Sequence, residues 1–244
     1  MAIGFYQTRL TLFSIPSICL YCYLSFLISS NKLNSWKYYL SFFTFISLSL
    51  GLFFHWIPGF QNFLVFESVQ LSSQSTSYNL WLNFDKSLIA IVGAFFLTSN
   101  ASKISRKNWK VFAGIFLLAI VTIYTTANIL RFTVFDPKLP EISLLWIFKV
   151  LVFTCASEEF FFRGFLWSAI EKFIKNQILT LVLTSLLFGF AHFSGGASYI
   201  FLASIAGFFY GWLYLKTGKI VLSILLHFGI NAIHFFFFSY PALN

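Results

Sequence analysis

The sequence predicts an all-α fold, a polytopic transmembrane helical bundle with about eight membrane-spanning helices. Of its 244 residues, 59% are hydrophobic and 9% are charged, whereas a soluble domain carries about 25% charged residues. The mean hydropathy is +0.83. Apolar runs long enough to cross ~30 Å of hydrocarbon recur along the whole chain. We therefore expect one integral membrane domain over residues 1–244, with no soluble domain or long linker.

Eight apolar runs give the expected helices in chain order. They are residues 10–29, 38–57, 83–99, 109–130, 142–166, 177–193, 197–215 and 219–239. The third and sixth runs are short for a bilayer, so we expect tilted, re-entrant or broken helices there. Gly207 and Gly211 in the seventh run let a neighbouring helix approach closely, which predicts helix packing. Arg9 precedes the first run without a small-residue cleavage site, so we expect a retained helix.

Positive charges in alternate loops predict the orientation. The loops after the first, third, fifth and seventh runs are basic, while 58–82, 131–141 and 194–196 hold far less positive charge. Cytoplasmic loops are enriched in Lys and Arg, so we expect the basic loops in the cytoplasm and both termini outside. The basic residues are Lys32, Lys37, Lys103, Arg106, Lys107, Lys110, Arg163, Lys172, Lys175, Lys216 and Lys219.

The same charges and the cysteines argue against two function classes. Because the basic residues fall in short loops, the net charge of +9 does not predict a nucleic-acid partner. Cys19 and Cys22 form a C-x-x-C pair, but there is no second pair or nearby histidine. We therefore expect no redox or zinc role for them.

A group of charges interrupts the fifth run. Glu158, Glu159 and Arg163 lie between apolar stretches, where each ionised group costs about 2.5–3.5 kcal/mol near a bilayer centre. Glu159 and Arg163 are four residues apart on a helix, which predicts an ion pair. Glu158 points about 100° away and stays available as a general base. The alternative is a structural salt bridge with a spare glutamate.

Two more groups of polar side chains follow on later helices. His192 lies one turn after Phe188, whose ring can pack on the imidazole, and Gly195 and Gly196 then end or loosen the helix. A structural histidine at a helix end is the alternative reading.

His227 and Asn231 share a helical face, so both side chains can donate to one point, as an oxyanion site requires. Interhelical hydrogen bonding is the alternative reading of this pair, and His234 could replace His227.

Together, the three groups resemble the CAAX-protease and bacteriocin-processing family over residues 140–235. This family includes the type II CAAX prenyl endopeptidases and bacterial intramembrane proteases called Abi proteins. The resemblance implies that Glu158 and His192 activate water and that His227 and Asn231 stabilise the oxyanion. Glu159 and Arg163 match supporting positions.

The resemblance also implies where the protein acts and on what. We expect a multi-pass protein of the bacterial inner (cytoplasmic) membrane whose partners are the lipid bilayer and a membrane-associated protein or peptide substrate. Two segments, 55–60 and 83–86, are similar to a bacterial subgroup linked to sorting of exported proteins, so a substrate with a carboxy-terminal sorting signal is one candidate. Simpler readings are a helix stop at Pro58-Gly59 and an interfacial pair of Asp85 with Lys86.

Two alternatives to a glutamate-type endopeptidase stay open. Glu158, His192 and His227 could bind zinc, since zinc favours two histidines and a carboxylate with one open position. We favour a site without cofactor, because asparagine is a poor zinc ligand and no H-E-x-x-H is present. The other alternative is a non-enzymatic membrane protein, such as a bacteriocin-immunity factor, that uses these groups as a polar network.

Overall fold

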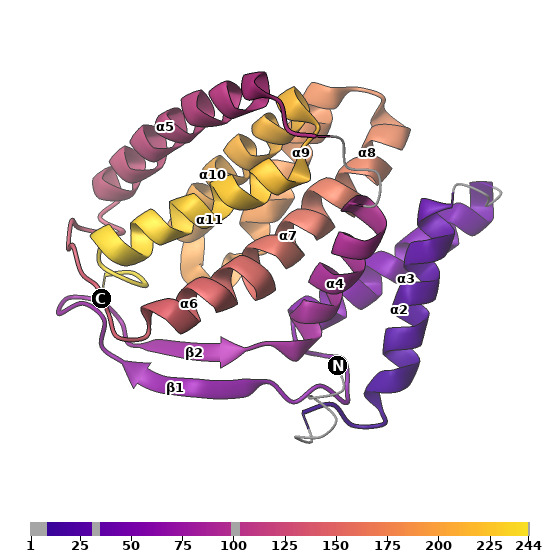
Figure 1. The fold of residues 1–244 in the computed structure, drawn as a ribbon, viewed down its shortest axis with the longest axis horizontal. Coiled ribbons are helices and arrows are strands. Elements are labelled where there is room, and N and C mark those ends of the chain that lie inside the picture. The colour runs from indigo at the N-terminus through magenta and orange to yellow at the C-terminus, as the bar shows by residue number, and fades with distance from the viewer. Residues whose placement is uncertain (1–8, 31–34, 99–102, 244) are drawn as a thin grey trace.

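A computed structural model describes residues 9–30, 35–98 and 103–243. Within these residues, eight helical rods form the bundle (Figure 1). They are α2 (Ser14–Ser29), α3 (Ser35–Phe53), α4 (Phe84–Thr98), α5 (Arg106–Ile129), a composite helix running from α6 to α8, α9 (Gln177–Phe190), α10 (Gly196–Thr217) and α11 (Ile220–Phe237). Each rod falls on one of the eight apolar runs, so the predicted all-α membrane bundle is confirmed.

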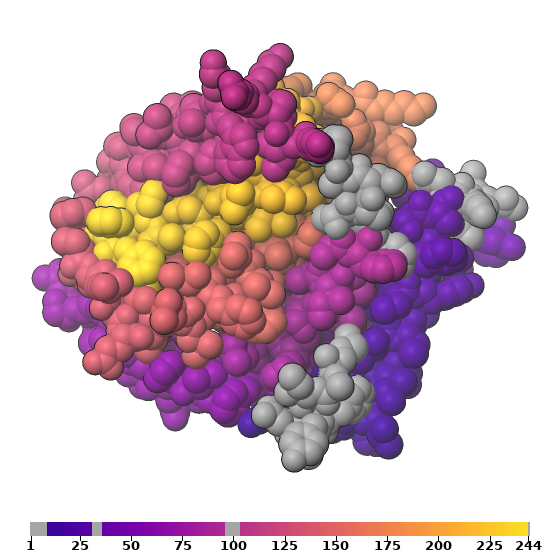
Figure 2. All heavy atoms as spheres, viewed as in Figure 1, coloured from indigo at the N-terminus to yellow at the C-terminus, as the bar shows by residue number. Residues whose placement is uncertain are grey.

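Three of the described helices are long and apolar enough to cross a membrane by themselves. They are Arg106–Ile129, Phe193–Thr217 and Ile220–Phe237, while Ser14–Ser29 and Gln177–Phe190 are shorter apolar helices. In the space-filling view, side chains of α11 form a band between α5 and α6 (Figure 2). The short third and sixth runs become α4 and α9, with 15 and 14 residues.

The composite helix is named the central helix here and alternates between α and π winding. Its parts are α6 (Ser143–Lys149), η1 (Val150–Ala156), α7 (Ser157–Glu159), η2 (Phe160–Leu166) and α8 (Trp167–Ile174). It packs against α4, α9 and α11. π-Turns are rare and occur frequently at functional sites, because they shift side chains out of the regular helical register. The two adjacent glutamates lie in the short α segment between the two π segments.

A two-stranded antiparallel hairpin was not predicted from the sequence. It consists of β1 (Phe63–Val69) and β2 (Tyr78–Leu82), and the serine-rich stretch 72–77 forms its turn. In a chain this apolar, strand alternation does not stand out from the surrounding runs. Ser72 and Ser75 in the turn are buried instead of lying in an open loop.

The loops separate into two ends. Arg163, expected among the basic loop residues, is instead buried within the central helix, where it pairs with Glu159. At the hairpin end, bridges join the amino-terminal residues, the hairpin, the α5–α6 loop and the carboxy-terminal residues: Leu10 to Phe60, Ser75 to Leu243 and Phe135 to Phe238. At the other end, the Lys172 ammonium lies 3.9 Å from the centre of the Tyr38 ring, which joins the basic end of α8 to the start of α3. Lys32 lies outside the described residues. Which end faces the cytoplasm stays a prediction.

Glycine brings α9 and α10 into close contact. A Cβ atom on Gly207 would lie 3.0 Å from Phe188 Cδ1, and one on Gly211 would lie 2.7 Å from Leu181 Cδ1. The predicted packing role of these two glycines is confirmed. The close approach also places the Gly207 carbonyl within reach of the central helix.

Candidate active site

The three charged residues of the central helix are buried. Glu159 and Arg163 are 0% exposed and Glu158 is 8% exposed. Arg163 Nη1 donates to Glu159 Oε1 at 2.9 Å, so the predicted ion pair is present. Arg163 Nη2 donates to the Gly207 carbonyl at 2.6 Å, and this bond fastens the central helix to α10.

Glu159 also orients His227. Its Oε1 atom lies 3.0 Å from His227 Nδ1, and a carboxylate can only accept, so Nδ1 carries the proton. The Tyr210 ring stacks on the imidazole with centroids 4.5 Å apart. The Glu159 carboxylate, held by Arg163, therefore fixes the His227 imidazole and directs its Nε2 atom away from Glu159. Catalytic and metal-binding histidines are commonly held in this way by a carboxylate on their other ring nitrogen.

His192 is fixed by the end of α9. The helix stops at Phe190, and His192 Nδ1 lies 2.8 Å from the Phe188 carbonyl oxygen. Because a carbonyl can only accept, Nδ1 is the protonated nitrogen and Nε2 is an acceptor in the neutral ring. The Phe188 ring packs 4.9 Å from the imidazole, as expected, and the Tyr199 ring closes the other side at 5.2 Å.

Glu158 lies between the two histidines. Its Oε2 atom is 3.9 Å from His192 Nε2 and 3.9 Å from His227 Nε2. These distances are too long for hydrogen bonds but suit one bridging water. Glu158 Oε2 is buried without a hydrogen-bond partner among the described residues. A buried oxygen of this kind is costly unless the site uses it.

Asn231 and His234 occupy different places on α11. Asn231 Nδ2 donates to Cys155 Sγ at 3.6 Å and lines the same cavity as Glu158 and His192. His234 also lines this cavity, but its Nε2 atom donates to the Ser239 carbonyl at 3.1 Å. The structure thus gives His234 a partner in the carboxy-terminal segment, and it gives His227 the position beside Glu158.

His192 lines three cavities, and Glu158 lines two of them. A cavity of about 800 Å³ contains Glu158, His192 and Asn231 and extends to the hairpin end. A second of about 200 Å³ contains Glu158 and His192 and lies against the end of α3. A small hollow of about 70 Å³ is lined by His192, His227 and Asn231. An extended peptide laid across the large and second cavities would therefore pass Glu158.

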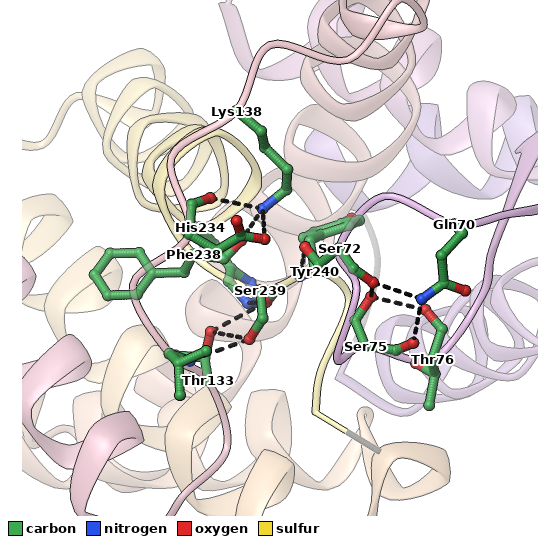
Figure 3. Close-up of polar contacts among 12 residues, drawn as sticks. Gln70, Ser72, Ser75, Thr76, Thr133, Lys138, His234, Phe238, Ser239 and Tyr240 are labelled. Atoms are coloured by element: carbon green, nitrogen blue, oxygen red, sulfur yellow. Dashed lines mark hydrogen bonds and ion pairs between the residues drawn. The ribbon is translucent and has the colours of Figure 1, made fainter.

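Polar contacts connect segments next to the large cavity, which Thr76, His234 and Tyr240 line (Figure 3). Thr133 and Ser239 hydroxyls lie 2.9 Å apart, the Tyr240 amide donates to Ser72, and the Lys138 ammonium donates to the Phe238 carbonyl. Burial lowers the pKa of Lys138. A hydrogen bond from Ser72, followed by the charge of Lys138, lowers the pKa of Asp136. These contacts join the hairpin turn and the α5–α6 loop to the carboxy-terminal segment.

Two lysines that line the site were not predicted from the sequence. Lys149 and Lys86 both line the large cavity with Glu158. Lys149 is an ionisable residue inside the fifth apolar run, and such a residue is a functional candidate by default. That signal was present in the sequence. The expected interfacial pair of Asp85 with Lys86 is wrong, because Asp85 Oδ2 lies 2.5 Å from His55 Nδ1.

The candidate ligands do not fit a resident metal ion. Within the described part of the chain, no group of three or more His, Cys, Asp or Glu side chains is arranged to hold one. Asn231, the remaining polar group of the site, donates to the Cys155 thiol, and an amide is a poor ligand for zinc. Independence from metal stays a prediction.

Residues 140–233 match the family model described as type II CAAX prenyl endopeptidase Rce1-like. No curated protein and no solved structure matches the chain. The matched segment contains the central helix and α9 to most of α11, which carry the three polar groups. The predicted resemblance is confirmed over this segment, which is similar to peptidases of the CAAX-protease type.

Proposed function

We propose that this chain, which is similar to the type II CAAX prenyl endopeptidases, is a glutamate-type intramembrane endopeptidase. The observation that carries the proposal is the position of Glu158 Oε2, which is buried, unpartnered and 3.9 Å from two oriented imidazoles. Glu159 also has a buried Oε2 atom without a hydrogen-bond partner, but its Oε1 atom is bonded to Arg163 and His227, whereas Glu158 hydrogen-bonds to neither of the imidazoles beside it.

In the proposed reaction, Glu158 and His192 hold the attacking water. The water oxygen bonds to the peptide carbonyl carbon, and its proton passes to the Glu158 carboxylate. When the C–N bond breaks, Glu158 returns this proton to the leaving nitrogen. The free lone pair on His192 Nε2 accepts the second hydrogen bond of the water, because Nδ1 is protonated and bonded to Phe188.

His227 and Asn231 stabilise the oxyanion of the tetrahedral intermediate. Since His227 Nδ1–H is given to Glu159, the ring donates from Nε2 only as an imidazolium. Glu159 stabilises that imidazolium, and this is the chemical role that we propose for the supporting glutamate. Asn231 Nδ2 supplies the second donor and exchanges its weak bond to Cys155 for one to the oxyanion.

The proposed substrate is a membrane-associated protein or peptide, and the proposed location is the bacterial inner membrane. The large cavity extends to the hairpin end, so a segment near the membrane surface can reach Glu158 without crossing the bundle. A protein with a carboxy-terminal sorting signal, an apolar segment flanked by basic residues, fits this geometry.

The proposal is tested by collecting new peptide termini. Purified full-length protein in lipid vesicles is mixed with membrane proteins from cells that lack it, and new termini are identified by mass spectrometry. We expect defined termini with the wild type and none with Glu158→Gln. Glu141→Gln is the matched control, because it removes an exposed carboxylate from the start of the same helix region.

Metal removal separates the two protease mechanisms. Cleavage should continue unchanged after exhaustive chelation, because Glu158 and His192 act on the water directly. Activity lost to a chelator and restored by stoichiometric zinc would assign a metalloprotease. Cleavage absent from wild-type preparations that are folded would support the immunity-type alternative.

A further inference from the structure

Two lysine ammonium groups flank the candidate base. Lys86, at the start of α4, lines both cavities that contain Glu158 and His192, so it lies where these cavities meet. Lys149 lines the large cavity from the α6–η1 junction of the central helix, nine residues before Glu158. The charge of Lys149 acts on those of Lys86 and Glu158.

Neither lysine has an acidic partner among the described residues. The other buried or paired carboxylates of the membrane region are taken: Asp85 by His55 and Glu159 by Arg163. Glu158 Oε2 itself is without a hydrogen-bond partner, so neither ammonium binds that oxygen. The Lys86 ammonium lies over the Phe53 ring, 5.6 Å from its centre.

Two unpaired cations beside a membrane-embedded cavity are unfavourable unless the site is completed by an anion. Both are half-buried, so they are not displayed to solvent as an ordinary basic loop is. Arg131 adds a third positive charge at the exposed rim of the same cavity. Against these three cations the cavity lining contains one carboxylate, Glu158.

We propose that Lys86 and Lys149 form an anion subsite that binds a carboxylate of the peptide substrate next to the bond that is cleaved. This rests on the proposed endopeptidase function. A carboxylate between the two ammonium groups makes charge-assisted hydrogen bonds in a region of low dielectric. It also fixes the register of the peptide across Glu158, because Lys86 lies at the junction of the two cavities.

The carboxylate can come from an acidic side chain or from a free carboxy-terminus. A lipid phosphate is a different ligand, and the structure favours the peptide, because the two lysines line the cavities of the candidate base. An anion bound there lies beside the water-activating groups, where a substrate must be and a lipid headgroup would block the reaction.

The test measures binding to purified full-length protein by thermal unfolding in nanodiscs of phosphatidylcholine. Three peptides are the probes. N-acetyl-Leu-Glu-Leu-amide carries an acidic side chain, N-acetyl-Leu-Gln-Leu-amide is its neutral control, and N-acetyl-Leu-Gln-Leu carries a free carboxy-terminus. We expect the Glu peptide or the free carboxylate to bind about tenfold more tightly than the neutral amide. Whichever carboxylate binds identifies the source.

Lys86→Gln and Lys149→Gln should each abolish this preference. Lys107→Gln is the matched control, since it removes an equal charge from the exposed start of α5 at the other end of the bundle. The two test variants remove unpaired cations, so we expect normal accumulation, and Lys86→Arg and Lys149→Arg should keep the preference. Equal binding of all three peptides would overturn the proposal, as would a preference that survives both glutamine variants. The same unfolding measurement is made in nanodiscs that contain phosphatidylglycerol. A Tm raised by this lipid but by none of the peptides would overturn the proposal in favour of a lipid site.

The experiments distinguish a failure of the anion subsite from a failure of the endopeptidase function. If no peptide or protein is cleaved but the lysine-dependent preference is measured, the function falls and the subsite stands. If termini appear in the mass spectra without any preference for an acidic residue near them, and the peptides bind equally, the subsite falls and the function stands.

Discussion

Two histidine–carboxylate clusters among the described residues differ in how Asp85 and Glu158 are bonded. At the base of the hairpin, Asp85 Oδ2 accepts from His55 Nδ1 at 2.5 Å and from Asn62 Nδ2 at 3.1 Å. Asn83 Nδ2 completes this cluster at 3.0 Å from His55 Nε2. In the bundle, by contrast, Glu158 approaches two imidazoles to 3.9 Å and hydrogen-bonds to neither.

The difference separates a structural cluster from a reactive one. His55 has a left-handed backbone, with φ at 60°, directly after α3, where the Trp56 amide donates to the Gly51 carbonyl at 2.8 Å. This is the place where a helix usually ends with glycine or asparagine. The side-chain bonds of His55 offset this strain and fasten α3 to the start of α4. We conclude that this cluster stabilises the fold, while the Glu158 cluster leaves bonding capacity for a substrate.

The largest loss of stability should follow from Arg163→Ala. The change leaves Glu159 as a fully buried carboxylate with one partner, His227, and removes the bond to Gly207. We expect about 3–5 kcal/mol of destabilisation by analogy with buried ion pairs. Thermal unfolding in detergent and accumulation in the membrane measure it. Unchanged stability and unchanged cleavage would show that the pair is dispensable.

A smaller loss should follow from Asp85→Asn. It replaces a charged acceptor by an amide in a site with two donors, and we expect about 1–3 kcal/mol. Hydrogen exchange should increase at residues 54–62 and 83–87, and cleavage per folded molecule should be retained. Cleavage lost while exchange stays as in the wild type would place this cluster in the chemistry and remove the distinction between the two.

Two substitutions at His55 distinguish the effect of backbone strain from the effect of the side-chain hydrogen bonds. His55→Ala loses the bonds and keeps the left-handed strain, whereas His55→Gly loses the bonds and relieves it. We therefore expect the alanine variant to be less stable than the glycine variant by about 1 kcal/mol. Paired thermal unfolding curves measure the difference. Equal stability of the two variants would show that strain at His55 contributes nothing.

The smallest effect is expected at Asp136, in the α5–α6 loop. The pKa of this carboxyl is lowered in the fold, so its stabilising contribution is present above its unfolded pKa and is lost as the pH falls through the folded one. Because the side chain is 39% exposed, we expect about 0.5 kcal/mol or less. Wild type and Asp136→Asn should differ slightly in Tm at pH 6 and coincide well below pH 4. A difference that persists in acid would assign another cause.

Sequence alone predicted the helices well, because each is marked by a run of apolar residues, although only three of the described helices are long enough to cross a membrane by themselves. It could not predict the hairpin, whose strands are as apolar as the helices around them. The π winding around Glu158 was also missed, since it depends on packing against α4 and α11. The motifs predicted which polar groups meet. They did not reveal that Asp85 pairs with His55, because the two are 30 residues apart.

The central claim is that Glu158 is retained for chemistry and not for the fold, and the stability of Glu158→Gln tests it most directly. The change keeps the shape and removes a buried charge that lacks a hydrogen bond at Oε2. We predict a Tm equal to or above that of the wild type, together with a loss of cleavage of about 10²–10⁴-fold. A Tm lowered as far as in Arg163→Ala, with cleavage per folded molecule retained, would contradict the account.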